Sequence, residues 1–390
     1  MGDPLVSVII PTTTQAQSLD QCLALLWARL PRDVAVEVVV VLNGATAEVE
    51  RVAERYADRI RLARSAVNLG FVGGFNRGRA AARGRLLASL HDDTFVEPGW
   101  LEALLAAVRD HPEAGLFCSL VTDPDGTPQS VGTLIWRSGH PTNPWLDEPP
   151  AAAAFAAVEP IQAGGSSALL MRADVFDAIG GLDERYYPAF FGDLDLAMGI
   201  WAAGFSVLLV PQSRARHRRG SSTSRRYRYF LYDRNHQQFS SKWAAELAAH
   251  PIHEPTAERL AEARAWVRDR AARLAASAAP RALPSRFHHD STEQEERLTR
   301  VAAVVAQDYS AALERDLERS TTAASALEVE LEARGSEVGR LKEDVRRASA
   351  EAASLRERLR ALEASRWQRL YRRLLPVLRP LARWRRAPSD

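Results

Sequence analysis

Two adjacent carboxylates follow a short apolar segment and form the first candidate site in the sequence. The tetrapeptide His91-Asp92-Asp93-Thr94 comes directly after the segment 86–90, which has the composition of a buried strand. Neighbouring carboxylates at a strand end are costly to keep ionised unless a cation neutralises them. Hard divalent ions prefer oxygen ligands and leave positions open for phosphate oxygens. The pair is therefore a candidate site for Mn²⁺ or Mg²⁺ against a diphosphate, although the same residues could simply cap a helix.

A third carboxylate, Asp193, lies at the start of a predicted amphipathic helix, within the segment Phe190 to Leu196. A general base that accepts a proton from a hydroxyl group must be ionised at neutral pH. The positive end of a helix dipole favours that ionised form. Asp193 is therefore a candidate general base, and the alternative is a plain helix cap.

A basic segment, Arg214 to Arg219, follows the predicted strand Val207 to Val210. Within it, His217 is expected to be neutral, because nearby positive charge disfavours the protonated ring. A neutral imidazole is a metal ligand, and Arg216 and Arg218 could neutralise a leaving diphosphate. The alternative is a solvated basic loop.

A glycine-rich segment, Asn68 to Gly78, precedes a predicted helix. Glycines allow the backbone to approach a ligand closely, and a helix start can receive a phosphate group. A glycine-rich segment by itself is more often only a turn.

Short apolar segments alternate with helical patterns in the first half of the chain, and they position these candidates. Each segment ends in turn residues: Val6 to Ile10 at Pro11, Val36 to Leu42 at Asn43, and Arg85 to Leu90 at His91. Alternation of this kind favours an α/β fold with a parallel sheet covered by helices on both faces. Ligands of such sheets bind at the carboxyl ends of the strands, where Asn43, Asp92 and Asp93 are expected.

The composition sets limits on the class of protein. A chain of 390 residues has room for one large domain with appendages, or for two domains. The net charge of +2 does not suggest a nucleic-acid-binding protein. No run of eighteen apolar residues occurs, and the N-terminus lacks a signal-peptide pattern. Cys22 and Cys118 lie in apolar segments without a disulfide framework, which fits the cytoplasm.

The second half of the chain becomes helical, so that we divide the sequence into four parts. They are an α/β domain over residues 1–240, a helical extension and linker over 241–292, a coiled coil over 293–365 and a basic amphipathic tail over 366–390. From Leu313 to Leu362, positions in alternating steps of four and three are apolar, except for Ser320 and Arg334. This pattern predicts a coiled coil that forms a parallel homodimer. A long helix packed on its own domain is the alternative.

The C-terminal tail combines cationic and apolar residues at helical spacing. This composition is typical of a helix that lies in a membrane interface, whereas a tail that only aids solubility is the alternative. Its eight arginines are Arg366, Arg369, Arg372, Arg373, Arg379, Arg383, Arg385 and Arg386.

Taken in order, the motifs from about Val6 to Ser222 resemble the family-two inverting glycosyltransferases of the GT-A (Rossmann-like) fold. The resemblance implies a metal bound by Asp93 and His217, with Asp193 as the catalytic base. Three positions depart from the family pattern: Leu42 stands where Asp is usual, His91 where an acidic residue or Asn is usual, and Gly192 where Glu is usual. The implied donor-binding residues are Pro11, Thr12, Asn43, Asn68, Gly70, Asn76 and Asp92, and those on the acceptor side are Gly165, Ser166 and Asp195.

The activity that this resemblance implies is a single displacement with inversion at the anomeric carbon. The donor would be a UDP- or dTDP-sugar, with dTDP-rhamnose as one candidate. The acceptor would be a glycan or lipid-linked hydroxyl in cell-surface polysaccharide or glycolipid synthesis, reached from the cytoplasm as a peripheral protein at the inner face of the membrane.

Two other classes of protein remain as alternatives. A nucleotidyltransferase would show a glycine-rich phosphate loop after the first strand, where this chain has Pro11-Thr12-Thr13-Thr14-Gln15. A catalytically degenerate transferase domain that acts as a coiled-coil scaffold would be consistent with His91 and Gly192.

Overall fold

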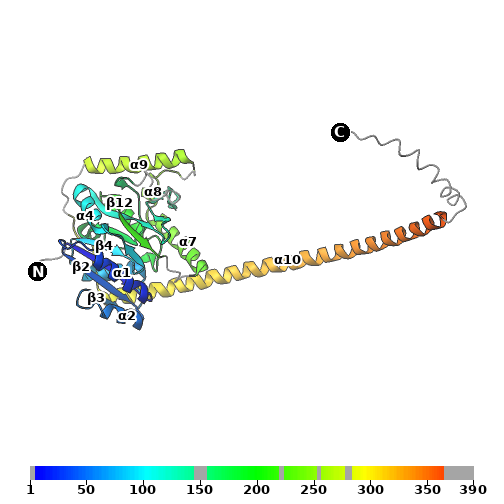
Figure 1. The fold of residues 1–390 in the computed structure, drawn as a ribbon, viewed down its shortest axis with the longest axis horizontal. Coiled ribbons are helices and arrows are strands. Elements are labelled where there is room, and N and C mark those ends of the chain that lie inside the picture. The colour runs from blue at the N-terminus through cyan, green and yellow to red at the C-terminus, as the bar shows by residue number, and fades with distance from the viewer. Residues whose placement is uncertain (1–4, 145–155, 219–223, 253–255, 277–282, 364–390) are drawn as a thin grey trace, which may run out of the picture. The chain divides into compact units, whose positions relative to one another are not determined.

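The chain is described by a computed structural model that covers residues 5–144, 156–218, 224–252, 256–276 and 283–363 (Figure 1). It forms two compact units, Met1–Ser310 and Ala311–Asp390. The predicted basic tail, residues 366–390, lies outside the described residues. Both cysteines are buried and free, as expected for apolar core positions.

A large mixed sheet forms the centre of the first unit. Its main strand order is β10-β12-β6-β11-β4-β1-β2-β3, with β5 paired to β12 and β7 paired to β6. A separate small sheet contains β8 and β9. The strands are β1 Val6–Thr12, β2 Val36–Asn43, β3 Arg61–Ser65, β4 Leu86–Leu90, β5 Thr94–Val96, β6 Ala114–Thr122, β7 Pro128–Ser130, β8 Leu134–Ile135, β9 Pro141–Thr142, β10 Glu159–Pro160, β11 Ala168–Arg172 and β12 Ser206–His217.

The sheet is mixed, and the predicted parallel arrangement holds for only part of it. Strands β3, β2, β1 and β4 are parallel to their neighbours, as the strand–helix alternation indicated. The prediction was wrong for β11, which runs antiparallel to both β4 and β6. The chain leaves β6 at its carboxyl end and returns through the loop-rich segment 123–167, so β11 enters the sheet from that same end. The loop before β11 therefore lies beside the carboxyl end of β4.

Helices cover both faces of the sheet and complete its two apolar cores (Figure 1). Buried residues of α1, α2 and α4 pack on one face, and buried residues of α3, α5, α6 and α7 pack on the other. The helices are α1 Ala16–Arg29, α2 Ala47–Glu54, α3 Gly70–Ala81, α4 Trp100–Asp110, α5 Ala173–Ala178, α6 Gly192–Ala202, α7 Arg225–Lys242, α8 Ala244–Leu247, α9 Ala257–Ala276 and α10 Ser291–Glu363, with a 3₁₀ turn, η2, at Glu184–Tyr186.

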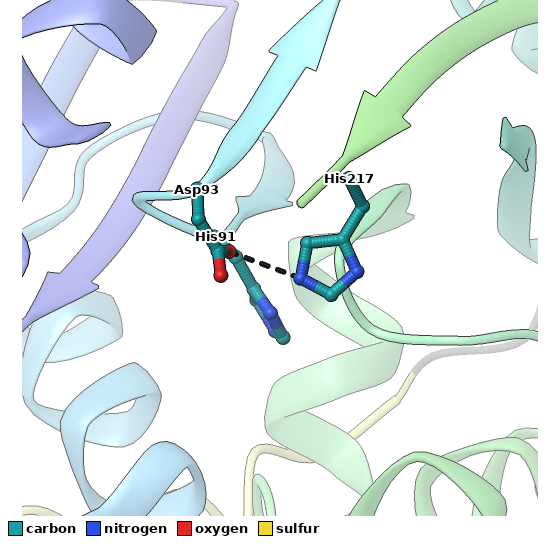
Figure 2. A group of neighbouring side chains, drawn as sticks. All are labelled: His91, Asp93 and His217. Carbon is teal, nitrogen blue, oxygen red and sulfur yellow. Dashed lines mark ion pairs between the residues drawn. The ribbon is translucent and has the colours of Figure 1, made fainter. Parts of the chain in front are cut away.

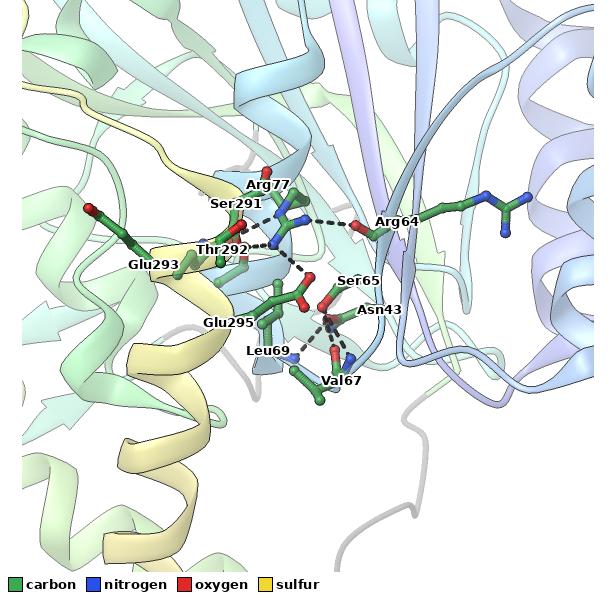
Figure 3. A network of polar contacts seen from close by, with 12 residues as sticks. Asn43, Arg64, Ser65, Val67, Leu69, Arg77, Ser291, Thr292, Glu293 and Glu295 are labelled. Carbon is green, nitrogen blue, oxygen red and sulfur yellow. Dashed lines mark hydrogen bonds and ion pairs between the residues drawn. The ribbon is translucent and has the colours of Figure 1, made fainter.

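The first turns of α10 are held on the first unit by one buried arginine of α3 (Figure 3). The Arg77 guanidinium donates to Gln294 Oε1 (3.0 Å), the Ser291 carbonyl (2.8 Å), Glu295 Oε1 (3.0 Å) and the Arg64 carbonyl (2.8 Å). A buried charge is tolerated when its hydrogen-bonding groups are satisfied in this way. Sequence analysis did not predict that a polar residue of α3 attaches α10 to the first unit.

Apolar packing adds to this attachment. Leu298 and Val305 of α10 are each 1% exposed. A Cβ atom at Gly73 would lie 2.4 Å from Leu298 Cδ1, so a larger residue there would require the Leu298 side chain to move. The start of α10 is therefore part of the first unit, which extends to Ser310.

The second unit continues α10 as helix to Glu363. Several apolar side chains of the predicted heptad positions are exposed along it, including Leu317 (67%), Leu327 (65%), Val345 (64%) and Leu355 (63%). A helical conformation is thus confirmed for the predicted heptads, and the coiled coil itself stays a prediction. None of the helices in the described residues is long and apolar enough to cross a membrane.

Candidate active site

The carboxyl ends of β4 and β12, the start of α6 and the loop before β11 surround one cavity of about 540 Å³. It contains residues that the sequence singled out from four distant segments: His91, Gly165, Ser166, Asp193 and His217. Its wall also includes Phe71, Gln129, Thr133, Asn143, Phe190, Phe191 and Tyr232. The mixed topology explains this, because the antiparallel β11 brings Ser166 next to His91.

Two of these side chains, His91 and His217, form a compact group of metal-ligating type with Asp93 (Figure 2). His217 Nε2 lies 3.0 Å from Asp93 Oδ1, and the His91 ring is 5.3 Å from the His217 ring in an edge-on arrangement. One ligand atom from each of His91, Asp93 and His217 lies within 4.8 Å of the others. Sequence analysis expected Asp93 and His217 here, and the structure adds His91.

The burial and charges around His91 and Asp93 leave both side chains able to bind a metal ion. Burial, together with the positive charge of His217, lowers the pKa of His91 to about 4, so its ring is neutral at pH 7. Burial alone would raise the pKa of Asp93, but its hydrogen bond to His217 and the charge on that ring outweigh burial and lower it. Asp93 is therefore ionised at neutral pH.

Gln129 sets the orientation of His217. Its amide Nε2 donates to Asp123 Oδ1 (2.7 Å) and to the His217 carbonyl (3.2 Å), so its Oε1 is the atom that faces His217 Nδ1, at 2.5 Å. Nδ1 must therefore carry a proton. Nε2 is then the nitrogen that faces the carboxylate oxygen of Asp93, and two such acceptor atoms at 3.0 Å require a proton or a cation between them.

Gln129 was not found from the sequence. It lies in β7, where sequence analysis singled out no motif.

Asp193 enters the cavity from a strained turn. Phe190 and Phe191, with φ of 71° and 67°, adopt the left-handed conformation that non-glycine residues rarely accept. Asn235 Nδ2 holds this turn by donating to the carbonyls of Ala189 (2.8 Å) and Phe190 (3.2 Å). These hydrogen bonds hold the strained backbone in place and so fix the direction of the Asp193 carboxylate.

The carboxylate of Asp193 has no cationic partner among the described residues. Burial raises its pKa, and this is opposed by hydrogen bonds from the backbone N–H groups of Leu194 and of Asp193 itself. The preceding residue is Gly192, where a Cβ atom would lie 2.7 Å from Val72 Cγ1. A larger residue at position 192 would therefore require the Val72 side chain to move.

Asp195, expected on the acceptor side, points away from this cavity. Residues two apart on a helix lie about 200° around its axis, and Asp195 faces the opposite side from Asp193. It accepts hydrogen bonds from Trp243 Nε1 (2.7 Å) and Tyr186 Oη (3.1 Å) and pairs with Lys242 Nζ (2.8 Å). These contacts give Asp195 a structural role in the core.

The predicted donor-side residues gather at the carboxyl ends of β1 and β2. Thr12 Oγ1 donates to Asp92 Oδ2 at 2.6 Å. Burial raises the pKa of Asp92 to about 6, helped by the charge on Asp93 and opposed by the Thr12 hydrogen bond. A Cβ atom at Gly74 would lie 3.1 Å from Pro11 Cβ, so α3 packs tightly on the end of β1.

Asn43 holds the glycine-rich turn in place. Its side chain accepts from the Leu69 N–H (2.8 Å) and donates to the Gly70 carbonyl (3.0 Å) and to Asn68 Oδ1 (3.3 Å). Gly70 has φ of 66°, and a Cβ atom there would lie 2.6 Å from the Pro188 carbonyl oxygen. The structure thus brings Asn43, Asn68 and Gly70 together as one turn beside the strand ends.

Three predicted residues lie outside this group. Asn76 is buried and binds the Leu182 backbone and Glu184 Oε1 (3.2 Å). Because side chains alternate along a strand, Arg216 and Arg218 lie on the opposite side of β12 from His217. Arg216 pairs there with Glu97 at 2.9 Å, and both arginines line a different hollow of about 410 Å³.

Part of the first unit matches a known protein family. Residues 7–177 match the family model described as glycosyl transferase family 2. The matched segment runs from β1 into α5, so this part of the first unit is similar to that family. The family that sequence analysis identified by resemblance is thus confirmed.

Among curated relatives, an N-acetylglucosaminyl-diphospho-decaprenol L-rhamnosyltransferase of Mycobacterium tuberculosis is 28% identical over 244 residues, which are 57% of this chain and 78% of the relative. The O-antigen biosynthesis protein RfbC of Myxococcus xanthus is also 28% identical, over 57% of this chain but only 18% of the relative. The matched part of this chain therefore covers most of the length of the rhamnosyltransferase but only a small part of the length of RfbC.

Among solved structures, GalNAc-T7 with UDP, GalNAc and Mn²⁺ superposes with a TM-score of 0.51 at 15% identity, over 64% of this chain and 50% of that one. At this identity the likeness supports the GT-A fold alone. The predicted fold class is confirmed for the first unit.

Proposed function

We propose that this protein is an inverting glycosyltransferase that moves a sugar from a nucleotide-diphosphate donor to a hydroxyl acceptor in cell-surface polysaccharide or glycolipid synthesis. The observation that carries the proposal is one cavity whose wall includes Asp193, a carboxylate with no cationic partner among the described residues, and His91 and His217, which form a group with Asp93. The Mycobacterium relative is named for transfer to a diphospholipid-linked sugar, which supports a lipid-linked acceptor here.

The residues present fit a divalent cation. Nε2 of His217 and the Asp93 carboxylate face each other at 3.0 Å, with the ring oriented by Gln129. His91 contributes a third donor from the cavity wall. A divalent cation bound there would supply positive charge that stabilises the leaving diphosphate.

Asp193 acts as the general base in this proposal. The acceptor hydroxyl loses its proton to the Asp193 carboxylate as its oxygen bonds to the anomeric carbon. The bond from that carbon to the diphosphate oxygen breaks in the same displacement, so the nucleoside diphosphate leaves and the configuration inverts. Burial places Asp193 in a water-poor wall and raises its pKa, which makes the carboxylate a stronger base while it is still ionised.

Residues at the strand ends would hold the nucleotide. Pro11, Thr12 and Asp92 border β1 and β4, and Asn43 fixes the adjacent turn. On the other side of the cavity, aromatic and small polar side chains offer a surface suited to a sugar. These are Phe190, Phe191, Tyr232, Ser166, Thr133 and Asn143.

The test measures both donor binding and turnover. Full-length protein is incubated with a panel of UDP- and dTDP-sugars and Mn²⁺, and release of the nucleoside diphosphate is followed. Calorimetry with UDP or dTDP is then repeated on Asp93→Ala and His217→Ala, which we expect to weaken binding in the presence of Mn²⁺ only. Metal-independent binding of equal strength in all three proteins would contradict the metal site. A protein that binds no nucleotide would favour the scaffold alternative.

A further inference from the structure

The donor set of the candidate metal site is richer in nitrogen than the Mg²⁺ sites of phosphate chemistry. Two imidazoles and one carboxylate converge, from the end of β4 and the end of β12 (Figure 2). Sites that bind Mg²⁺ for phosphate chemistry use one or two carboxylates with several waters. Here the position that sequence analysis expected to be acidic or Asn is His91.

We propose that His91 is a metal ligand together with Asp93 and His217, and that this set selects a transition-metal ion, with Mn²⁺ as the representative, and rejects Mg²⁺. The metal-binding part stands on the side chains alone, whereas the role of the ion in sugar transfer rests on the proposed function.

The position of His91 supports a ligand role. Two hydrogen bonds fix the backbone of His91. The His91 N–H donates to the Ser167 carbonyl (3.1 Å), and Cys22 Sγ donates to the His91 carbonyl (3.6 Å). The ring packs against Phe71, with 5.1 Å between ring centroids, and its Nε2 lies 3.3 Å from Ser166 Oγ. The ring is thus held in the cavity wall rather than free to turn into solvent.

The chemistry of the donors decides the selectivity. Imidazole nitrogen suits first-row transition metals, whereas Mg²⁺ prefers oxygen and dehydrates reluctantly. An imidazole in place of a carboxylate at position 91 also removes one negative charge, leaving Asp93 as the single anionic ligand of the three. Both effects weaken Mg²⁺ binding more than Mn²⁺ binding.

Gln129 would act as a positioning residue for this site. It holds the proton on His217 Nδ1 and so leaves Nε2, 3.0 Å from Asp93 Oδ1, as the nitrogen that would bind the ion. Residues that orient a metal-bound histidine typically change metal affinity by about 10–100-fold when they are replaced. Gln129→Leu should therefore weaken Mn²⁺ binding by about tenfold or more, with no change in the ligands themselves.

The experiment compares metal binding by full-length wild-type protein, His91→Asp, His91→Ala and a control, His111→Ala, whose ring pairs with Glu113 away from the cavity. Calorimetry with Mn²⁺ and with Mg²⁺ is run without donor sugar, and pulsed electron paramagnetic resonance of bound Mn²⁺ detects coupling to imidazole nitrogen. Thermal unfolding checks that each variant is folded.

We expect the wild type and His111→Ala to bind Mn²⁺ with nitrogen coupling from two imidazoles and to bind Mg²⁺ weakly. His91→Ala should lose one nitrogen coupling and at least about tenfold in Mn²⁺ affinity. His91→Asp should gain Mg²⁺ affinity and so reduce the preference for Mn²⁺.

Unchanged nitrogen coupling in His91→Ala, or equal affinities of the wild type for the two ions, would overturn the proposal. These outcomes are separate from those of the proposed function. Selective Mn²⁺ binding without any sugar transfer would leave the metal site standing and remove the transferase, whereas transfer supported equally by Mg²⁺ would do the reverse.

Discussion

Two carboxylates of one helix, Asp193 and Asp195, should respond in opposite ways to the same substitution. Asp193 faces the cavity with only backbone N–H partners, whereas Asp195 is held in the core by Tyr186, Lys242 and Trp243. Replacement of either by Asn keeps the size and removes the charge. The pair is therefore a matched test of which carboxylate serves chemistry and which serves the fold.

For Asp193→Asn, we expect turnover to fall by about 10²- to 10⁴-fold, the usual contribution of a general base. This corresponds to about 3–5 kcal/mol in the activation free energy. Donor binding should be unchanged, because Asp193 lies on the acceptor side of the cavity.

Stability should rise in the same variant. Burial raises the pKa of Asp193 in the folded protein, so its ionised form costs free energy of folding. This cost is present at pH values above the raised folded pKa and vanishes below the unfolded pKa of about 4, where both states are protonated. The melting temperature of Asp193→Asn should thus exceed that of the wild type at pH 8 and approach it near pH 4.

For Asp195→Asn, we expect the folded state to lose about 1.5–3 kcal/mol, the range for hydrogen bonds to charged groups. Burial also raises the pKa of Asp195, against the opposing charge of Lys242. The asparagine, however, would turn an N–H₂ group toward the Lys242 ammonium and lose the ion pair.

Steady-state transfer assays and thermal unfolding at pH 4, 6 and 8 would be run on both variants. Wild-type turnover in Asp193→Asn would refute its assignment as the base. Equal loss of stability in the two variants would refute the electrostatic reasoning.

Three further predictions concern the helix α10 and the tail. Arg77→Met should destabilise the first unit by about 3–5 kcal/mol, because it leaves the partners of a buried cation unsatisfied; the exposed Arg51→Met is the control, expected to change stability by less than about 0.5 kcal/mol, and equal effects in chemical denaturation would contradict this. A chain ending at Ser310, which retains the buried Val305, should sediment as a monomer and the full chain as a parallel dimer; a full-length monomer at micromolar concentration would disprove the coiled coil. Full-length protein should pellet with anionic liposomes at physiological salt, since each basic residue near such a surface contributes about 1 kcal/mol, and a chain ending at Ala364 should not; equal pelleting of both would remove the membrane anchor.

Local sequence was sufficient for the elements that local physics controls. The apolar segments that end at Pro11, Asn43 and His91 became the strands β1, β2 and β4, because buried β-rich segments closed by turn residues have few other conformations. The charge and position of Asp93 and His217 likewise indicated a metal site before their distance was known. The heptad spacing predicted a long helix for the same reason, since helical periodicity is a property of the segment itself.

Tertiary structure decided which of these residues meet and which way they face. The antiparallel entry of β11 brought Ser166 to His91, and strand alternation turned Arg216 and Arg218 away from His217. Gln129 gained its role only because β7 pairs with β6, the neighbour of β12. Such contacts join residues tens of positions apart, and their directions depend on sheet order and helix phase, which no local pattern specifies. The sequence by itself thus determined the elements and the class of chemistry, and the packing of the sheet determined the site.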